Sequence, residues 1–228
     1  TDTQRAIEAS EAAFTAWSAK PAKARASLLR KWFELIIANK EDLAVLMTTE
    51  QGKPIAESRG EIEYAASFIE WFAEECKRVD GEILQSPKVD QKLLVLKQPI
   101  GVCAAITPWN FPIAMITRKV APALAVGCTS VIKPAKLTPL SALALAELAD
   151  RAGLPAGVLN VLTSSSASDV GKELCSNPIV RKISVTGSTE IGKLIMRLSS
   201  ETLKKLSLEL GGNAPFIVFD DADLDAAV

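Results

Sequence analysis

The first 79 residues place apolar side chains at intervals of three and four, which is the spacing of one face of an α-helix. A cap at Asp2 or Thr3 predicts a first helix that runs to about Ala19. Gly52 is expected to end a later helix and Pro54 to open the next, because these residues are common at those two positions. The remaining helices of this part are predicted over residues 22–38, 41–51 and 54–79.

From residue 100 onward, short apolar runs alternate with amphipathic stretches. Before that point, residues 80–91 are expected to form a loop and residues 92–98 (KLLVLKQ) a strand. Strands that alternate with helices over short links are typical of a parallel sheet. We therefore predict an α/β fold, a Rossmann-like parallel sheet with helices on both faces, preceded by a helical segment. Its strands are predicted over residues 100–106, 129–134, 158–163, 181–187, 206–210 and 215–219, and its helices over 113–127, 138–153, 166–175 and 188–200.

Composition excludes several classes of protein. The chain has 228 residues, 48% of them apolar, and 26 basic against 27 acidic residues, so no binding to nucleic acid or to an anionic membrane is expected. The uncharged stretch 98–117 has the length of a membrane span, but three prolines interrupt it, and we expect buried strand, loop and helix there instead. The N-terminal TDTQRAIEAS is expected to be a capped helix and not a signal peptide.

The sequence has no histidine, and its four cysteines, at positions 76, 103, 128 and 175, lie far apart. A zinc site is therefore not expected. Ser-His-Asp and Cys-His catalysis are excluded within these residues. The apolar neighbours of Cys103 and Cys128 predict buried, unreactive thiols in a reducing compartment.

In open parallel sheets, ligands bind beyond the carboxyl ends of the strands. Residues 107–112 (TPWNFP) follow one predicted strand, and Asn110 at this bend between two prolines could donate to a developing oxyanion. The alternative is an asparagine that bonds its own turn. Glu209, in ELGG, stands between apolar residues at another strand end, where a carboxylate could be tuned into a general base.

Two further strand ends carry less specific motifs. Residues 186–192 (TGSTEIG) open a helix, with Gly187 at a tight turn and Ser188 or Thr189 as the cap, and such an N-terminus attracts phosphate. The alternative is an ordinary strand-turn-helix connection. Lys133, in KPAK, could hold a sugar hydroxyl or a phosphate, and the alternative is a solvated lysine.

Together, TPWNFP, KPA, GSTEIG and ELGG, in this order and each at a strand end, resemble an aldehyde dehydrogenase over the whole chain. Residues 97–135 and the run ELGGNAPFIVFDDADLD are most similar to the succinate-semialdehyde branch, whose close relatives act on glutarate or other short semialdehydes. The resemblance implies NAD(P)-dependent oxidation of succinate semialdehyde to succinate through a cysteine thioester. It also implies a homo-oligomer, dimer or tetramer, in a bacterial cytoplasm or, as the alternative, a mitochondrial matrix.

The resemblance assigns roles residue by residue. Asn110 would be the oxyanion donor, Glu209 the general base, and Arg118 the group that binds the far carboxylate of the substrate, which suits a guanidinium. Lys136 replaces a glutamate that is frequent in NAD-preferring members. Because a lysine does not repel a 2′-phosphate, we expect tolerance of NADP or a slight preference for it over NAD. The residues that would line the cofactor are Ile106, Thr107, Pro108 and Trp109 at the nicotinamide, Lys133 and Ala135 at the adenosine ribose, Gly187, Ser188 and Ile191 at the pyrophosphate, and Leu210 and Gly211 at the nicotinamide ribose.

The same resemblance divides the chain into four parts. These are residues 1–79 (the helical part of the cofactor-binding domain), 80–99 (the start of an oligomerisation arm), 100–211 (the dinucleotide-binding core) and 212–228 (the beginning of a catalytic domain). The nucleophilic cysteine of the family, in F-x-N-x-G-Q-x-C, would follow Val228. The chain is thus expected to be a fragment that binds a dinucleotide without oxidising aldehydes. The alternatives are an inactive nucleotide-binding module or pseudoenzyme, and a structural protein on the same scaffold.

Overall fold

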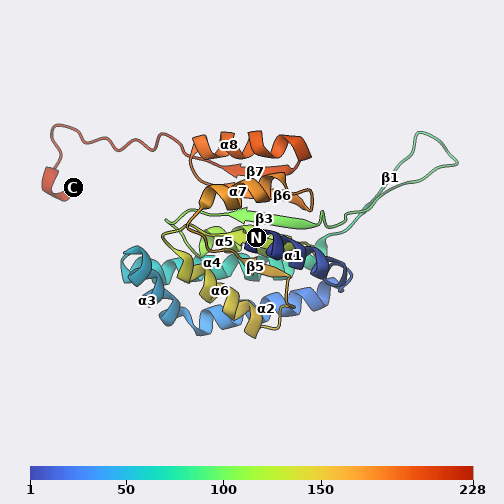
Figure 1. Cartoon of the computed structure of the whole chain (residues 1–228), viewed down its shortest axis with the longest axis horizontal. Helices are drawn as coiled ribbons and strands as arrows, with labels where there is room; N and C mark the ends of the chain where they lie inside the picture. Colours follow the sequence, from blue (N-terminus) through green and yellow to red (C-terminus); the bar gives the residue numbers. More distant parts are fainter. Residues whose placement is uncertain (228) are drawn as a thin grey trace.

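The computed structural model describes residues 1–227 and contains a five-stranded, fully parallel sheet (Figure 1). The strand order is β5-β4-β3-β6-β7, so β3 is central and β7 is an edge. Helices lie on both faces, which confirms the predicted α/β fold. The strands are β3 (Val102–Ile106), β4 (Thr129–Lys133), β5 (Leu159–Val161), β6 (Val180–Thr186) and β7 (Lys205–Glu209).

Successive residues of the central strands point into two different hydrophobic cores, as the pleat of a strand requires. Ala105 and Ile132 lie in the larger core, which is built mainly from helices of the first part of the chain together with α5 and α6. Ala104 and Val131 face the second core, under α7 and α8. The helices that connect the strands are α5 (Ala114–Ala125), α6 (Pro139–Arg151), α7 (Ala167–Ser176) and α8 (Thr189–Ser199).

The helical spacing of the first part of the chain is confirmed. Its helices are α1 (Asp2–Ser18), α2 (Ala22–Ala38), α3 (Lys40–Gln51) and α4 (Ile55–Glu75), the last continued by a short 3₁₀ helix (Cys76–Arg78). The cap of α1 is Thr1, and the prediction of Asp2 or Thr3 is wrong, because the Thr1 hydroxyl accepts from the Gln4 amide while the Gln4 side chain accepts from the Thr1 amino group. Gly52 ends α3 in the left-handed region, at φ 86°, as predicted.

A β-hairpin projects from the body of the protein between α4 and the sheet (Figure 1). It pairs β1 (Glu82–Leu84) antiparallel with β2 (Leu93–Val95). The loop predicted over 80–91 is wrong at β1, because a strand at β2 needs a partner for its backbone groups and the preceding segment supplies it. The strand predicted over 92–98 is confirmed over Leu93–Val95 only.

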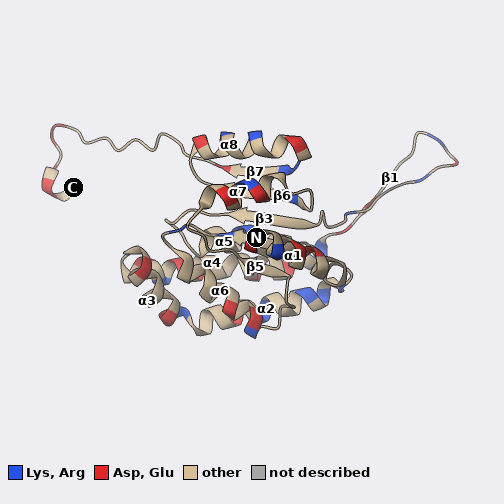
Figure 2. Ribbon diagram, in the orientation of Figure 1, with Lys and Arg blue, Asp and Glu red and all other residues tan. Residues whose placement is uncertain are grey.

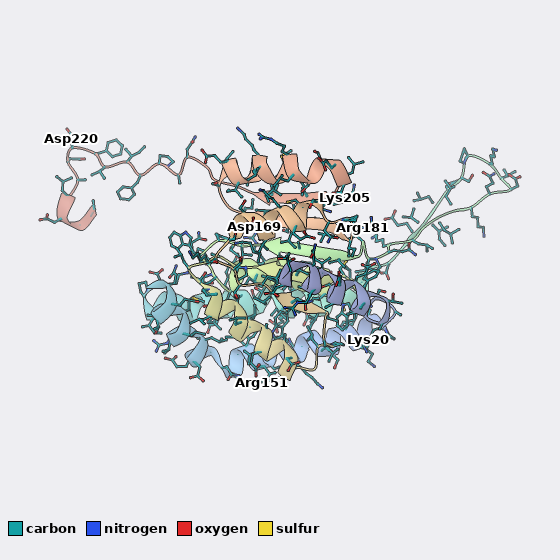
Figure 3. The ribbon with its side chains drawn as sticks, viewed as in Figure 1. Lys20, Arg151, Asp169, Arg181, Lys205 and Asp220 are labelled. Carbon is teal, nitrogen blue, oxygen red and sulfur yellow. The ribbon has the colours of Figure 1, made fainter. Side chains whose placement is uncertain are left out.

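After β7 the chain leaves the sheet as an extended segment that ends in one short helix, α9 (Leu224–Ala227) (Figure 1). The strand predicted over 215–219 is wrong, because no described strand lies beside this segment to complete its hydrogen bonds. Its side chains extend away from the helices, as Figure 3 shows at Asp220, and Phe216 is 80% exposed.

Basic and acidic residues are interspersed along the helices (Figure 2). All four cysteines are buried, which confirms the predicted burial of Cys103 and Cys128. No helix within residues 1–227 is both long and apolar enough to cross a bilayer.

Candidate functional site

Four strands end at the same edge of the sheet, and the residues that follow them lie close together. Ile106 at the end of β3 is in register with Lys133 at the end of β4 and with Val185 near the end of β6. Thr186 is in register with Glu209 at the end of β7. The four motifs that the sequence singled out therefore meet along one edge, as the parallel topology requires.

The loop after β3 is held by its backbone and leaves the Asn110 side chain free. The Thr107 amide donates to the Lys133 carbonyl at 3.2 Å, and the Asn110 carbonyl accepts from Lys53 Nζ at 2.7 Å. The exposed side chain of Asn110 makes no hydrogen bond with another described residue, so the alternative of an asparagine that bonds its own turn is wrong. Trp109 beside it is 53% exposed, so both side chains are accessible to a ligand.

Glu209 occupies a polar, half-exposed position and not the apolar one expected from its neighbours in the sequence. Its side chain is 52% exposed, its Oε2 lies 3.3 Å from an Arg118 nitrogen, and the Thr186 hydroxyl donates to it at 3.2 Å. The physical reason is the period of a strand, in which Leu208 and Leu210 point away from the face that Glu209 uses. The structure thus brings Glu209 and Arg118 together at the carboxyl ends of the strands.

Lys119 and Thr186 are functional candidates that the sequence reasoning missed. Lys119 Nζ donates to the Thr186 hydroxyl at 2.6 Å, and that hydroxyl donates onward to Glu209. Burial lowers the pKa of Lys119 to about 8, although the Glu209 carboxylate acts in the opposite direction. The sequence feature that could have indicated Lys119 is its position directly after Arg118 on α5, the helix that follows the Asn110 loop.

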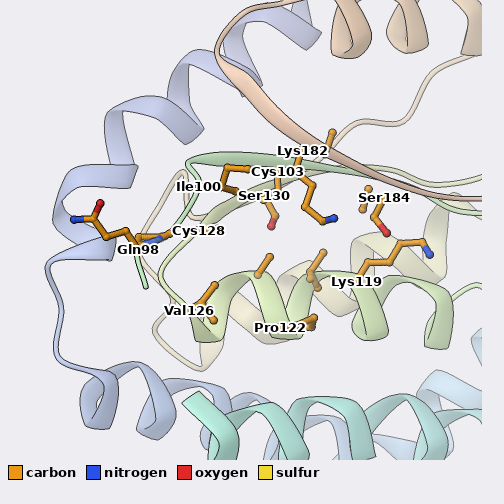
Figure 4. A pocket seen from close by; sticks show the side chains of 15 residues that line it. Gln98, Ile100, Cys103, Lys119, Pro122, Val126, Cys128, Ser130, Lys182 and Ser184 are labelled. Atoms are coloured by element: carbon orange, nitrogen blue, oxygen red, sulfur yellow. The ribbon is translucent and has the colours of Figure 1, made fainter. Parts of the chain in front are cut away.

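Two adjoining hollows, of about 340 and 320 Å³, lie between α5 and the strands. Figure 4 shows the first of them. Both are lined by Lys119, Pro122, Lys182 and Ser184, so they form one groove along this face of the sheet. The groove ends at the Arg118–Glu209 pair. It therefore has space and positive charge for a small anionic molecule beside a carboxylate.

Two buried polar groups at the strand ends have hydrogen-bonding capacity that the described residues do not satisfy. Lys133 is buried, which excludes the solvated alternative, and within residues 1–227 its ammonium donates only to the Pro134 carbonyl, at 3.1 Å. Burial lowers the pKa of this lysine. The hydroxyl of Thr107, also buried, has no hydrogen-bond partner among the described residues. Such unsatisfied groups fit a site for a polar ligand with several hydroxyls.

The turn between β6 and α8 fits a phosphate on one side. A Cβ added at Gly187 would meet nothing within 4 Å, and Ser188 caps α8 by accepting from the Ile191 amide at 3.3 Å. The Gly187 amide itself donates to the Glu209 carbonyl at 3.1 Å, so the first amides free for an anion belong to Ser188 and Thr189. Gly192 serves packing, because a Cβ there would lie 2.6 Å from the Leu210 side chain.

The remaining candidates lie around these groups. Lys136 is exposed and forms no ion pair with a described residue, whereas Ala135 before it is half-buried. Gly211 has open space around the position of a Cβ. Pro108 and Ile106 are half-buried at the start of the loop, and Ile191 is 45% exposed.

Comparisons with known proteins point to one family. A sequence profile described as the aldehyde dehydrogenase family matches residues 1–228. The chain is 66% identical over 227 residues to a glutarate-semialdehyde dehydrogenase of Pseudomonas putida, and 65% identical over 227 residues to a succinate-semialdehyde dehydrogenase (NADP⁺) of Escherichia coli. A crystal structure of an E. coli NADP-dependent enzyme superposes with a TM-score of 0.93 at 65% identity, and the match covers 99% of this chain and 47% of that one.

The two curated relatives are matched over 100% of this chain but only 47% of their own length. The chain thus spans about half the length of the curated relatives it matches.

Proposed function

Because the chain belongs to the aldehyde dehydrogenase family, we propose that it is the dinucleotide-binding part of an enzyme that oxidises succinate semialdehyde to succinate with NADP⁺ or NAD⁺. One observation carries the proposal: Glu209 and Arg118 meet at the end of the groove, at the same edge of the sheet from which the Asn110 loop emerges and where parallel folds bind ligands. The relatives named as semialdehyde dehydrogenases support it.

The cofactor would lie across the four strand ends. The open side of Gly187 and the free amides of Ser188 and Thr189 suit its pyrophosphate, and the partly unpartnered Lys133 ammonium suits a ribose hydroxyl. The unpaired Thr107 hydroxyl and exposed Trp109 would line the nicotinamide. When bound, NAD(P)⁺ supplies an acceptor for the hydride that leaves the substrate carbon.

In this proposal the residues of the chain assist a cysteine that lies outside it. The Asn110 amide would donate to the oxyanion formed when a thiolate attacks the aldehyde carbon. Glu209 would then take a proton from the water that hydrolyses the thioester, which requires its contact with Arg118 to loosen. The hydrogen bonds from Lys119 to Thr186 and from Thr186 to Glu209 would fix the position of that carboxylate.

Arg118 would select aldehydes that carry a carboxylate. Replacing it by leucine is expected to raise the KM for succinate semialdehyde about 10–100-fold, because a charge-assisted hydrogen bond contributes about 1.5–3 kcal/mol. The KM for butanal, which has no carboxylate, should change by less than about threefold in the same variant. Steady-state kinetics with both aldehydes provide the measurement. Arg151→Leu, which removes another arginine paired with a glutamate, should leave both constants unchanged, and equal effects on the two aldehydes would contradict the assignment.

Lys136 would favour the 2′-phosphate of NADP. Lys136→Glu is expected to weaken NADP binding by at least about tenfold, because it replaces attraction by repulsion at an exposed position, while NAD binding stays within about threefold. Fluorescence titration of the full-length protein with each nucleotide measures this. Lys31→Glu, at an exposed position on α2, makes the same charge change away from the site. Comparable affinity for NADP in the wild type and in Lys136→Glu would contradict the role of Lys136 at the 2′-phosphate.

The oligomerisation arm and the domain division are part of the same proposal. Within residues 80–99, the hairpin of β1 and β2 exposes apolar side chains, with Ile83 76% and Leu94 64% exposed, which suits burial in a dimer or tetramer. We propose residues 1–79 and 100–211 as one cofactor-binding unit and 212–228 as the start of the catalytic domain. The cytoplasm, or a mitochondrial matrix, is the proposed compartment.

The test is an assay of the full-length protein with succinate or glutarate semialdehyde and either nucleotide. The rate is measured from the absorbance of the reduced nicotinamide. Aldehyde-dependent reduction of the cofactor is the expected result. Binding of the nucleotide with no turnover on any aldehyde would favour the inactive module instead. Absence of both binding and turnover would overturn the proposal.

A further inference from the structure

A buried ion pair lies directly behind the Asn110 loop. Lys53, in the link between α3 and α4, places its ammonium 2.5 Å from a carboxylate oxygen of Glu61 on α4. The two side chains are only 7% and 1% exposed. Removing two charges from water is costly, and well-packed apolar residues would often stabilise such a position as well or better. This pair therefore calls for a role beyond stability.

Both members of the pair bind the backbone of the loop and the start of α5. Lys53 Nζ donates to the Asn110 carbonyl at 2.7 Å, and it lies 4.0 Å from the centre of the Phe111 ring. Glu61 Oε1 accepts from the amides of Ile113 and Ala114, at 3.0 and 3.2 Å, where α5 begins. The pair thus holds the chain at Asn110 and again three and four residues later.

These contacts fix the peptide of Asn110 and leave its side chain free. The second donor to the same carbonyl is the Gln51 side chain at 3.3 Å, so the donors come from the end of α3 and the link that follows it, and the acceptor comes from the loop after β3. A donor to an oxyanion must be held in place before the reaction, since a displacement of about 1 Å can lower a rate about 100-fold. A buried charge-assisted bond restricts the loop more than a bond to water could.

We propose that Lys53 and Glu61 are positioning residues that set the orientation of the Asn110 side chain. This inference rests on the proposed function, in which Asn110 donates to the oxyanion. Neither residue touches the groove, so both would act only through the loop.

A double-mutant cycle in the full-length enzyme tests the inference. The pair is replaced as Lys53→Met with Glu61→Gln, which leaves no uncompensated buried charge and keeps an oxygen for the amides of Ile113 and Ala114. The exposed Lys40–Glu63 pair, which also joins α3 to α4, receives the same two substitutions as the matched control. Rates are expressed per active site by titration, and the Tm and the nucleotide Kd report folding.

The pair variant is expected to lower kcat about 10–100-fold with an intact Asn110, and less than about threefold when Asn110 is already alanine. The control pair should change kcat less than about threefold in either background. A merely structural role would lower kcat by the same factor with and without Asn110. That result, or an unchanged kcat in the pair variant, would overturn the inference.

A second variant and an assay of the wild type complete the experiment. Should the pair variant not fold, Gln51→Ala removes the other donor at a half-buried position, and a fall in kcat of about threefold that disappears in the Asn110→Ala background supports positioning, whereas no fall overturns it. The wild type is assayed first. An inactive wild type refutes the proposed function itself, whereas an active wild type with an indifferent pair variant refutes only the positioning role.

Discussion

Replacing Glu209 by glutamine in the full-length enzyme is expected to lower the steady-state kcat about 10²–10⁴-fold, which is the usual contribution of a general base. The amide keeps the size of the side chain but cannot take a proton from water. In the proposed reaction, hydride would leave the substrate before the thioester is hydrolysed, so the first turnover should survive. Rapid mixing with succinate semialdehyde and NADP⁺ should therefore give a stoichiometric burst of reduced cofactor followed by a slow steady state.

Glu147→Gln provides the control for Glu209→Gln. Glu147 is also a half-exposed glutamate paired with an arginine, but it lies on α6, away from the groove. Its replacement should change kcat less than about threefold. Loss of the burst together with the steady state in Glu209→Gln would show that the carboxylate acts before hydride transfer, against the role assigned to it.

Asn110→Ala should slow the burst itself. Loss of one oxyanion donor costs about 10²–10³ in kcat, and because the oxyanion forms before hydride transfer, the burst rate should fall by a similar factor. The nucleotide Kd should stay within about threefold, since the loop is held through its backbone and not through this side chain. The measurement is the burst rate at saturating substrate and cofactor.

Asn39→Ala is the matched change for Asn110→Ala. The Asn39 side chain donates to the Leu35 carbonyl between α2 and α3, a structural contact. A fall in Tm with little change in kcat is expected there. Asn110→Ala with a normal burst rate would contradict the oxyanion role, and a large change in its nucleotide Kd would indicate a cofactor-binding role instead.

The order and type of the main elements were predictable because each is strongly periodic. Residues 22–38 were predicted as a helix, and α2 has these bounds. Whether a short strand-forming segment finds a partner strand was not predictable from the segment itself. The strand β1 exists because β2 lies opposite it, while residues 215–219 have strand-forming residues but no partner.

The candidate site was predictable as a set of strand ends but not in its contacts. The parallel topology alone brings Ile106, Lys133 and Glu209 to one edge. The prediction that Glu209 lies among apolar groups was wrong, because its neighbours in the sequence are not its neighbours on the sheet face. Lys53 and Glu61 lie eight residues apart, and their bonds to the backbone of Asn110 and of Ile113 cross more than fifty residues, so no local pattern marks them.

The most direct test of the central claim, that these strand ends form a dinucleotide site serving aldehyde oxidation, is a crystal structure of the full-length protein with NADP⁺ and succinate semialdehyde. The account predicts the pyrophosphate beside Gly187 and Ser188, the nicotinamide beside Thr107, and the substrate carboxylate on Arg118. A nucleotide bound away from these strand ends, or a substrate carboxylate that does not contact Arg118, would contradict it.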